Sequence, residues 1–158
     1  MRKKVSRIIF TNGVLDLLHP GHYNLLTTCR AFACRDGKVI VGIDTDLKAK
    51  KDKGNNRPYY SQEERKNNLL SLKYPLDSLL IPLVDEVIFF SSNEELYDII
   101  NAVEPDIIVK GKSWIGNVVG SDLAEVVLYD IQEGLSTSDI ESRVISKNKR
   151  IGGFDPNI

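Results

Sequence analysis

The sequence predicts a single α/β domain in which a five-stranded parallel sheet carries helices on both faces. The first observation is the alternation of five short apolar runs with segments of helical periodicity, which is typical of a parallel sheet. The second is the length of 158 residues, which suits one domain, with no internal repeat or linker to divide it. The third is a strand–glycine turn–helix order near the N-terminus, the place where α/β domains usually bind nucleotides. We expect the domain to span residues 1–145 and a polar, glycine-rich tail to span residues 146–158.

The predicted elements follow from local patterns. Strands are expected near residues 7–11, 38–43, 86–90, 106–110 and 125–131, where β-branched and apolar residues cluster. A first helix over residues 21–33 follows from an apolar stripe of period 3.6. Ser61 and Glu64 form a capping-box pattern for a helix reaching about residue 72. Asn93 is expected to cap a third helix, and Ser136–Ser138 offer caps for a last helix that carries Ile140 and Val144.

Two segments lack a regular pattern. Residues 46–56 are charged and almost free of apolar side chains, so we expect a mobile loop that closes over a ligand. Residues 73–84 are apolar but contain Pro75 and Pro82, which predicts a connector with at most a short helical turn. The two cysteines, Cys29 and Cys34, are five positions apart on a predicted helix and point in different directions. We expect both to be small buried side chains rather than a disulfide or a metal site.

Composition excludes several classes of partner. The net charge is −1 and the pI about 6.1, which gives no general field for nucleic acid or for a membrane surface. No apolar run approaches the roughly 18 residues that a membrane span needs. The basic N-terminus leads into a short strand-like run and not into an apolar signal core. We expect a cytoplasmic protein.

Both histidines of the chain lie in the tetrapeptide His19-Pro20-Gly21-His22, just after Thr11-Asn12-Gly13. Two imidazoles at the start of a helix, close to a glycine that lets the backbone approach a ligand, suit a polyphosphate. A surface pair or half of a metal site is the alternative. A metal site would need further cysteine or histidine ligands, and none is spare, so we expect no metal site built by the protein.

Charged residues near this turn have two interpretations each. Lys48, Lys50, Lys51 and Lys53 follow the second strand, and they form either a solvated face or a phosphate site at the carboxyl edge of the sheet. Asp16 could orient a histidine, contact substrate, assist a metal or cap a turn.

The chain resembles the cytidylyltransferase-like nucleotidyltransferases, a family with an HxGH signature. The resemblance rests on five segments in the family's order and covers residues 5–145: Thr11 to His22, Val41 to Asp46, Lys53 to Pro58, Pro105 to Gly111 and Gly134 to Ser138. Together with the alternation of elements, it implies the strand order 3-2-1-4-5, with the histidine turn at the point where the order reverses.

The resemblance also implies roles for individual residues. His19, His22 and Lys53 would be catalytic, the histidines as donors to a transition state and not as nucleophiles. Asp16 and Trp114 would contact substrate, while Lys48 and Lys50 match the family's loop less closely. Ser113 stands where the family usually has an acidic residue. The nucleotide would be bound by Thr11, Asn12, Gly13, Arg57, Lys110, Gly111, Ser136, Thr137 and Ser138.

Two branches of the family fit this chain. Three features look more like heptose-1-phosphate adenylyltransferases, which use ATP: Thr11 to Gly13, Val109 to Gly111, and Val118 to Asp122. The other branch is the glycerol-3-phosphate cytidylyltransferases, which use CTP. Either implies transfer to a phosphorylated sugar or polyol, Mg²⁺ carried with the triphosphate, and a homodimer. The long segment 73–84 could reshape a dimer surface or the acceptor pocket. A nucleotide-binding regulatory module without catalysis is the third possibility.

Overall fold

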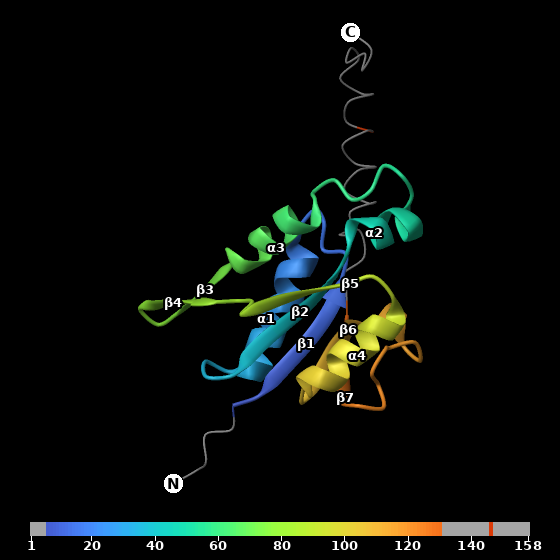
Figure 1. Ribbon diagram of the computed structural model, residues 1–158. Helices are drawn as coiled ribbons and strands as arrows, with labels where there is room; N and C mark the ends of the chain where they lie inside the picture. Colours follow the sequence, from blue (N-terminus) through green and yellow to red (C-terminus); the bar gives the residue numbers. More distant parts are fainter. Residues whose placement is uncertain (1–5, 131–145, 147–158) are drawn as a thin grey trace.

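The computed structural model describes residues 6–130 and residue 146, and its centre is a five-stranded parallel sheet (Figure 1). The strand order is β5-β2-β1-β6-β7. The strands are β1 (Ile8–Gly13), β2 (Lys38–Asp44), β5 (Glu86–Phe90), β6 (Ile107–Gly111) and β7 (Glu125–Tyr129). This is the predicted order of the five strands, and every pair in the sheet is parallel. The prediction of the fold class is confirmed.

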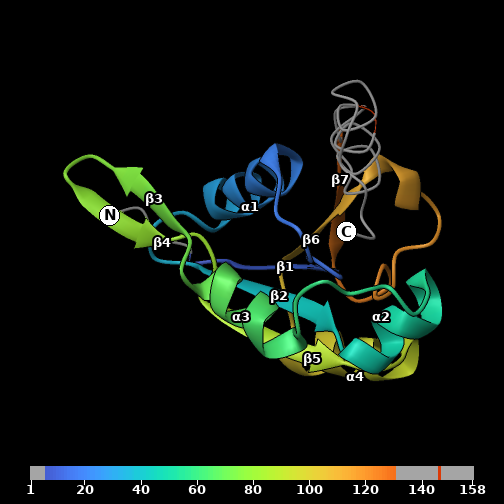
Figure 2. The same cartoon turned by 90° about the horizontal axis from the view of Figure 1, so that it is seen from above.

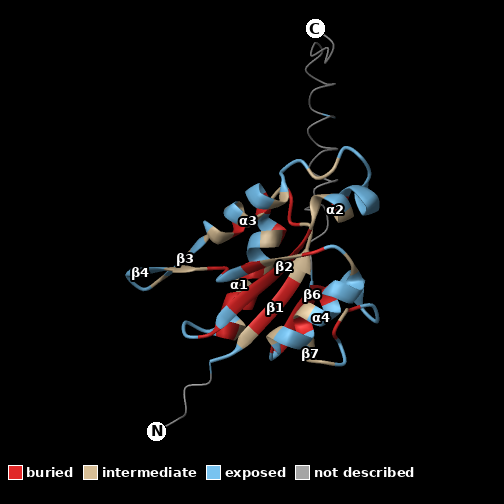
Figure 3. Cartoon of the chain, viewed as in Figure 1, coloured by how far each residue is buried: buried red, intermediate tan, exposed pale blue. Residues whose placement is uncertain are grey.

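Helices cover the two faces of the sheet separately (Figure 2). On one face, α1 (Pro20–Ala33) and α3 (Gln62–Leu70) contribute Leu26 and Leu69 to one apolar core. On the other face, α4 (Asn93–Val103) contributes Leu96 and Ile100 to a second core. Buried residues concentrate along the sheet strands between these layers (Figure 3). Side chains of neighbouring strand residues therefore reach different helices.

Capping side chains set the starts of the helices. At α3, Ser61 Oγ accepts from the backbone N–H of Glu64 and Glu64 Oε2 accepts from that of Ser61, so the predicted capping box is confirmed. At α4 the cap is Ser92, whose Oγ accepts from the backbone N–H of Glu95 at 3.1 Å. The prediction that Asn93 caps this helix was wrong by one residue, because both residues are good caps and the turn geometry decides between them.

The prediction of a loop over residues 46–56 was wrong for most of its length. Helix α2 occupies Asp46–Lys53, with Thr45 as its cap. A single buried residue, Ala49, packs it on the sheet edge, while Leu47 is 82% exposed. Lys48 forms ion pairs with Asp44 and Asp52, each four positions away along the chain. One small contact and local ion pairs are enough for a short helix on an existing sheet.

The segment 73–84 is a hairpin and not an irregular connector. Strands β3 (Lys73–Leu76) and β4 (Leu79–Pro82) pair antiparallel, separately from the main sheet, and project away from it (Figures 1 and 2). A two-stranded ribbon has only edge strands, where the missing N–H of Pro75 or Pro82 is tolerated. Tyr74 packs against the core shared with α1 and α3, whereas Leu80 is 71% exposed.

The cysteines behave differently from each other. Both are free thiols, as expected, and Cys29 is buried. Cys34 is exposed, which contradicts the prediction that both are buried, because it follows the last turn of α1 with a positive φ of 59°. Among the described helices, none combines the length and apolar character needed to cross a bilayer. The predicted last helix and the tail fall outside the described residues.

Candidate active site

The predicted site residues that the structure describes gather at the carboxyl edge of the sheet. Strands β1, β2 and β6 end there at Gly13, Asp44 and Gly111. Strand β1 lies between β2 and β6, and the helices that adjoin these strands cover opposite faces. Ligands of open α/β sheets bind where the connections diverge in this way. The site is therefore built around the end of β1.

The two histidines form a capping box at the start of α1. His19 is the cap, and its Nδ1 accepts from the backbone N–H of Gly21 at 3.1 Å. His22 lies in the first turn, and its Nδ1 accepts from the backbone N–H of His19 at 3.3 Å. The ring centroids are 3.8 Å apart. Pro20 suits the first helical position because its missing N–H has no partner there in any helix.

These contacts determine which ring nitrogen carries a proton. A nitrogen that accepts a hydrogen bond holds a lone pair, so a neutral imidazole bonded through Nδ1 carries its proton on Nε2. Burial lowers the pKa of His22 to about 4; the neighbouring His19 lowers it further, while the backbone carbonyl of Leu17 acts in the opposite direction. His22 is therefore a neutral ring with an Nε2–H donor at ordinary pH.

The ends of β1 and β6 are joined by two side chains. Thr11 Oγ1 donates to the backbone carbonyl of Val109 at 2.7 Å, so its hydroxyl links the two strands. Lys110 Nζ donates to the carbonyl of Asn12 at 2.8 Å and lies 4.5 Å from the centroid of the Trp114 ring. Burial lowers the pKa of Lys110 to about 8, Asp44 opposes the shift and Lys48 adds to it. A buried ammonium thus stands at the strand ends.

Gly13 and Gly111 complete the strand ends. A Cβ at Gly13 would come no nearer than 3.8 Å to another side chain, that of Leu15, so the space beside the glycine is open to a ligand. Gly111 is buried and immediately precedes the short 3₁₀ helix η1 (Lys112–Trp114). Trp114 is 50% exposed, which leaves its ring accessible for stacking.

Asp16 holds a distant backbone segment. Its two carboxylate oxygens accept from the backbone N–H groups of Tyr59 at 2.7 Å and Tyr60 at 2.9 Å. Burial raises the pKa of Asp16, although the hydrogen bond from Tyr60 and the positive charges of Arg65 and Arg57 oppose the rise. Of the interpretations open from sequence, the contacts therefore favour a carboxylate that fixes a turn.

Arg65 is a residue of the site that sequence reasoning missed. Its side chain is fully buried, and its guanidinium donates to the carbonyls of Val14, Asp44 and Tyr60 and to the carboxylate of Asp46. It thereby joins the ends of β1 and β2 to the segment that Asp16 holds. The sequence shows only an arginine in a charged helix, and no local pattern indicates that it is buried.

The basic residues after β2 differ in orientation. Lys53 is exposed at the last position of α2, and Lys50 is exposed on the same helix. Lys48 turns inward, where its Nζ contacts Asp44 at 3.4 Å and Asp52 at 2.6 Å. The guanidinium of Arg57 stacks 4.8 Å from the ring centroid of Tyr59, next to the backbone that Asp16 holds. Ser136, Thr137 and Ser138 lie outside the described residues.

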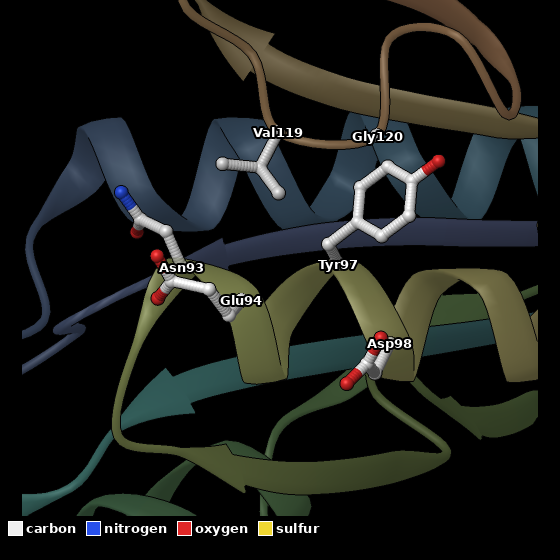
Figure 4. Close-up of a pocket in the computed structure, with 6 residues that line it drawn as sticks. All are labelled: Asn93, Glu94, Tyr97, Asp98, Val119 and Gly120. Carbon is white, nitrogen blue, oxygen red and sulfur yellow. The ribbon is translucent and has the colours of Figure 1, made fainter.

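A shallow hollow lies elsewhere on the molecule (Figure 4). It measures about 520 Å³ and runs between α4 and the backbone at Val119 and Gly120, with Asn93, Glu94, Tyr97 and Asp98 on its helical side. None of the predicted site residues lines it. The candidate site at the end of β1 is therefore defined by its polar groups and not by a deep cavity.

The sheet order and the capped histidine pair at its turning point define the class of Rossmann-like nucleotidyltransferase domains. The sequence model of the cytidylyltransferase-like family matches residues 10–148, so the chain belongs to this family. This confirms the family resemblance seen in the sequence.

Curated relatives carry a common name. The chain is 41% identical over 145 residues to the "Bifunctional protein HldE" of Wolinella succinogenes, and 39% identical over 148 residues to that of Nitratiruptor sp.. These alignments cover 90% and 92% of this chain but only 28% and 29% of the relatives, so the chain spans less than a third of their length.

Solved structures share the fold. A lipopolysaccharide core biosynthesis protein from Thermoplasma volcanium superposes with a TM-score of 0.57 at 19% identity, covering 80% of this chain and 96% of that one. A protein of unknown function from Archaeoglobus fulgidus gives a TM-score of 0.56 at 13% identity, with 78% and 90% covered. At these identities the likeness concerns the fold alone.

Proposed function

We propose that this chain is an adenylyltransferase that moves AMP from ATP to a phosphorylated sugar, such as heptose 1-phosphate, and releases pyrophosphate. The observation that carries the proposal is the His19–His22 capping box. It sets two Nε2–H donors beside the N-terminus of α1, at the edge where the strand order reverses. Donors fixed in this way favour the charge that develops when a phosphoanhydride bond breaks.

The reaction needs no enzyme nucleophile. A phosphate oxygen of the acceptor, already ionised, attacks the α-phosphorus of ATP, and the bond from that phosphorus to the oxygen bridging to the β-phosphorus breaks. Pyrophosphate leaves with the electron pair. His19 and His22 donate to the phosphate oxygens as charge accumulates on them, and the neutral state of His22 suits donation without proton loss. Lys53 and Arg57, on α2 and the following segment, would approach the triphosphate from the β2 side.

Mg²⁺ would accompany the triphosphate and offset its negative charge. Within residues 6–130 and 146, no three histidine, cysteine, aspartate or glutamate side chains are grouped to hold a metal ion. Asp16, the acid nearest to the histidine turn in sequence, uses both oxygens on backbone N–H groups. In this proposal the phosphates of the nucleotide hold the ion.

The choice of ATP over CTP rests on similarity. The HldE relatives and the segments around Thr11, Lys110 and Val119 support the adenylyltransferase branch. Val118 and Ile107, both apolar and buried, belong to different cores on opposite faces of the sheet, so they do not form one aliphatic wall for adenine. A homodimer, expected from the family, remains a prediction.

The test is pyrophosphate release with a panel of ATP, CTP, GTP and UTP against heptose 1-phosphate, glycerol 3-phosphate and other sugar phosphates. The mass of the nucleotide product identifies the transferred group. We expect turnover with ATP and a sugar 1-phosphate. A tenfold preference for CTP, about 1.4 kcal/mol of differential transition-state binding, would move the chain to the cytidylyltransferase branch. Binding of nucleotides without any turnover would favour a regulatory module.

A further inference from the structure

We propose that Lys48, which is paired with Asp44, and Lys110 form a separate subsite for the phosphate group of the acceptor. The inference rests on the proposed function. It adds to that function two residues without an established role, because Lys48 matches the family's basic loop less closely and Asp44 carries no assigned role. The structure nevertheless turns Lys48 inward and leaves Lys53 exposed.

The residues of this subsite share one side of the sheet. Successive strand residues alternate between faces, so Asn12 follows Phe10, Asp44 follows Ile40 and Lys110 follows Ile108 on the face covered by α4. Phe90 of the same core lies under the Lys48 ammonium, 5.5 Å from its ring centroid. The histidine turn instead begins α1, on the opposite face.

The charges of the subsite are incompletely balanced in its interior. Asp44 and Lys110 are each only 6% exposed. Asp44 Oδ2 lies 3.4 Å from Lys48 Nζ, and the charge of Asp44 raises the pKa of Lys110 while that of Lys48 lowers it. Lys48 is thus paired with a buried carboxylate, whereas the ammonium of Lys110 contacts the backbone carbonyl of Asn12. The second carboxylate near Lys48 is Asp52, at 2.6 Å, whose side chain is 44% exposed.

This arrangement suits a phosphate dianion. The exposed Asp52–Lys48 pair contributes little stability because solvent screens it, and the Asp52 side chain can swing into water. A phosphate would replace the Asp52 oxygen on Lys48 and bring a second oxygen toward Lys110. The Asp52 carboxylate oxygen therefore marks the position on Lys48 that a phosphate oxygen would take.

The acceptor is the better occupant than the nucleotide, and this assignment moves Lys110 from the nucleotide-binding role that the family resemblance implies. If the triphosphate lies at the histidine turn, on the α1 face, a phosphate at Lys48 lies across the end of β1 from it. Attack on the α-phosphorus requires two anions to approach from different directions. Separate cations for each reduce their repulsion and orient the attacking oxygen.

Inorganic phosphate is the probe, and Trp114 is the reporter. Trp114 is the sole tryptophan of the chain, and Lys110 Nζ lies 4.5 Å from its ring centroid, so an anion at Lys110 should change its fluorescence. Phosphate is titrated into the full chain with and without saturating ATP. We expect phosphate to bind in both cases and Lys48→Met to weaken it at least about tenfold. Lys48→Arg, which keeps the charge, should remain within about threefold of the wild type.

Two further variants sharpen the result. Lys51→Met makes the same change at an exposed position of α2 and should leave phosphate binding unchanged. Asp52→Asn removes the competing carboxylate and should tighten it. Displacement of phosphate by ATP, equal effects of Lys48→Met and Lys51→Met, or weaker binding in Asp52→Asn would each overturn the subsite. Turnover by the wild-type chain is measured separately, so failure of the proposed function is distinguished from failure of this inference.

Discussion

The His19–His22 turn and the Tyr59–Tyr60 segment lie at the same edge of the sheet but are held in different ways. The histidine turn is fixed by contacts to residues two and three positions away. The tyrosine segment is held by Asp16, 43 and 44 positions away, while Arg65 links Tyr60 to strand ends at Val14 and Asp44. The conformation of the first region depends on residues that are neighbours in sequence, whereas that of the second depends on contacts that form only in the folded chain.

The largest expected effect is on the long-range contacts. Arg65→Leu removes a buried guanidinium and leaves three carbonyls and the Asp46 carboxylate without their donor. We expect the free energy of unfolding, measured in urea, to fall by about 3–5 kcal/mol. Arg35→Leu, at an exposed position, is the control and should change it by about 0.5 kcal/mol or less. A loss of less than about 1 kcal/mol for Arg65→Leu would show that the segment does not depend on this residue.

The histidine turn is the counterpart. His22→Ala removes an Nε2–H donor, and kcat should fall by about 10²–10³. Stability should fall by only about 1 kcal/mol, the usual loss for a helix cap. Asn24→Ala, at an exposed position of the same helix, serves as the control. Full activity of His22→Ala, or a nucleotidylated residue trapped on the protein, would refute the donor role.

A change at Asp16 tests whether the two regions act together. Asp16→Asn replaces one acceptor oxygen with a donor, so the N–H of Tyr59 or Tyr60 loses its partner. We expect a local loss of about 1–3 kcal/mol of stability, measured as faster hydrogen exchange at these two amides. We also expect kcat/KM for ATP to fall, because Arg57 is no longer held in place. Glu63→Gln, exposed on α3, should alter neither. Unchanged exchange at Tyr59 and Tyr60 would mean that Asp16 serves another purpose.

The same contrast explains what the sequence could predict. The α3 capping box and the location of the histidine turn follow from residues a few positions apart, and the strand order follows from the alternation together with the family resemblance. Arg65 has no such signal, because its partners come from three separate parts of the chain. Helix α2 was missed because its single buried contact, Ala49, depends on the sheet beneath it. The hairpin was missed because the prolines that normally oppose a strand are harmless in a two-stranded ribbon.

A smaller effect is expected at the exposed end of α2. Lys53→Ala should lower kcat/KM for ATP about tenfold, since it removes a positive charge that would approach the triphosphate of the bound nucleotide. Folding should be unaffected, because Lys53 is exposed. Lys51→Ala provides the matched comparison. Equal activity of the two variants would remove Lys53 from the site, and slow hydrogen exchange in α2 that nucleotide does not alter would argue against closure of this segment over the ligand.

The most direct test of the donor pair is the protonation state of the two histidine rings, followed by ¹⁵N NMR. They are the only histidines in the chain, so their ring signals are simple to assign. Because the pKa of His22 lies at about 4, below the usual 6.5, the ring should gain its second proton only as the pH falls through about 4. Stability should decline as the pH falls from 6.5 to about 4, since the unfolded chain binds the proton before the folded chain does.

The structure predicts a neutral His22 ring protonated on Nε2 at neutral pH, with its Nε2–H signal shifting when ATP is added. A ring protonated on Nδ1, or a His22 that titrates near 6.5, would contradict the capped donor pair on which the proposed nucleotidyl transfer depends.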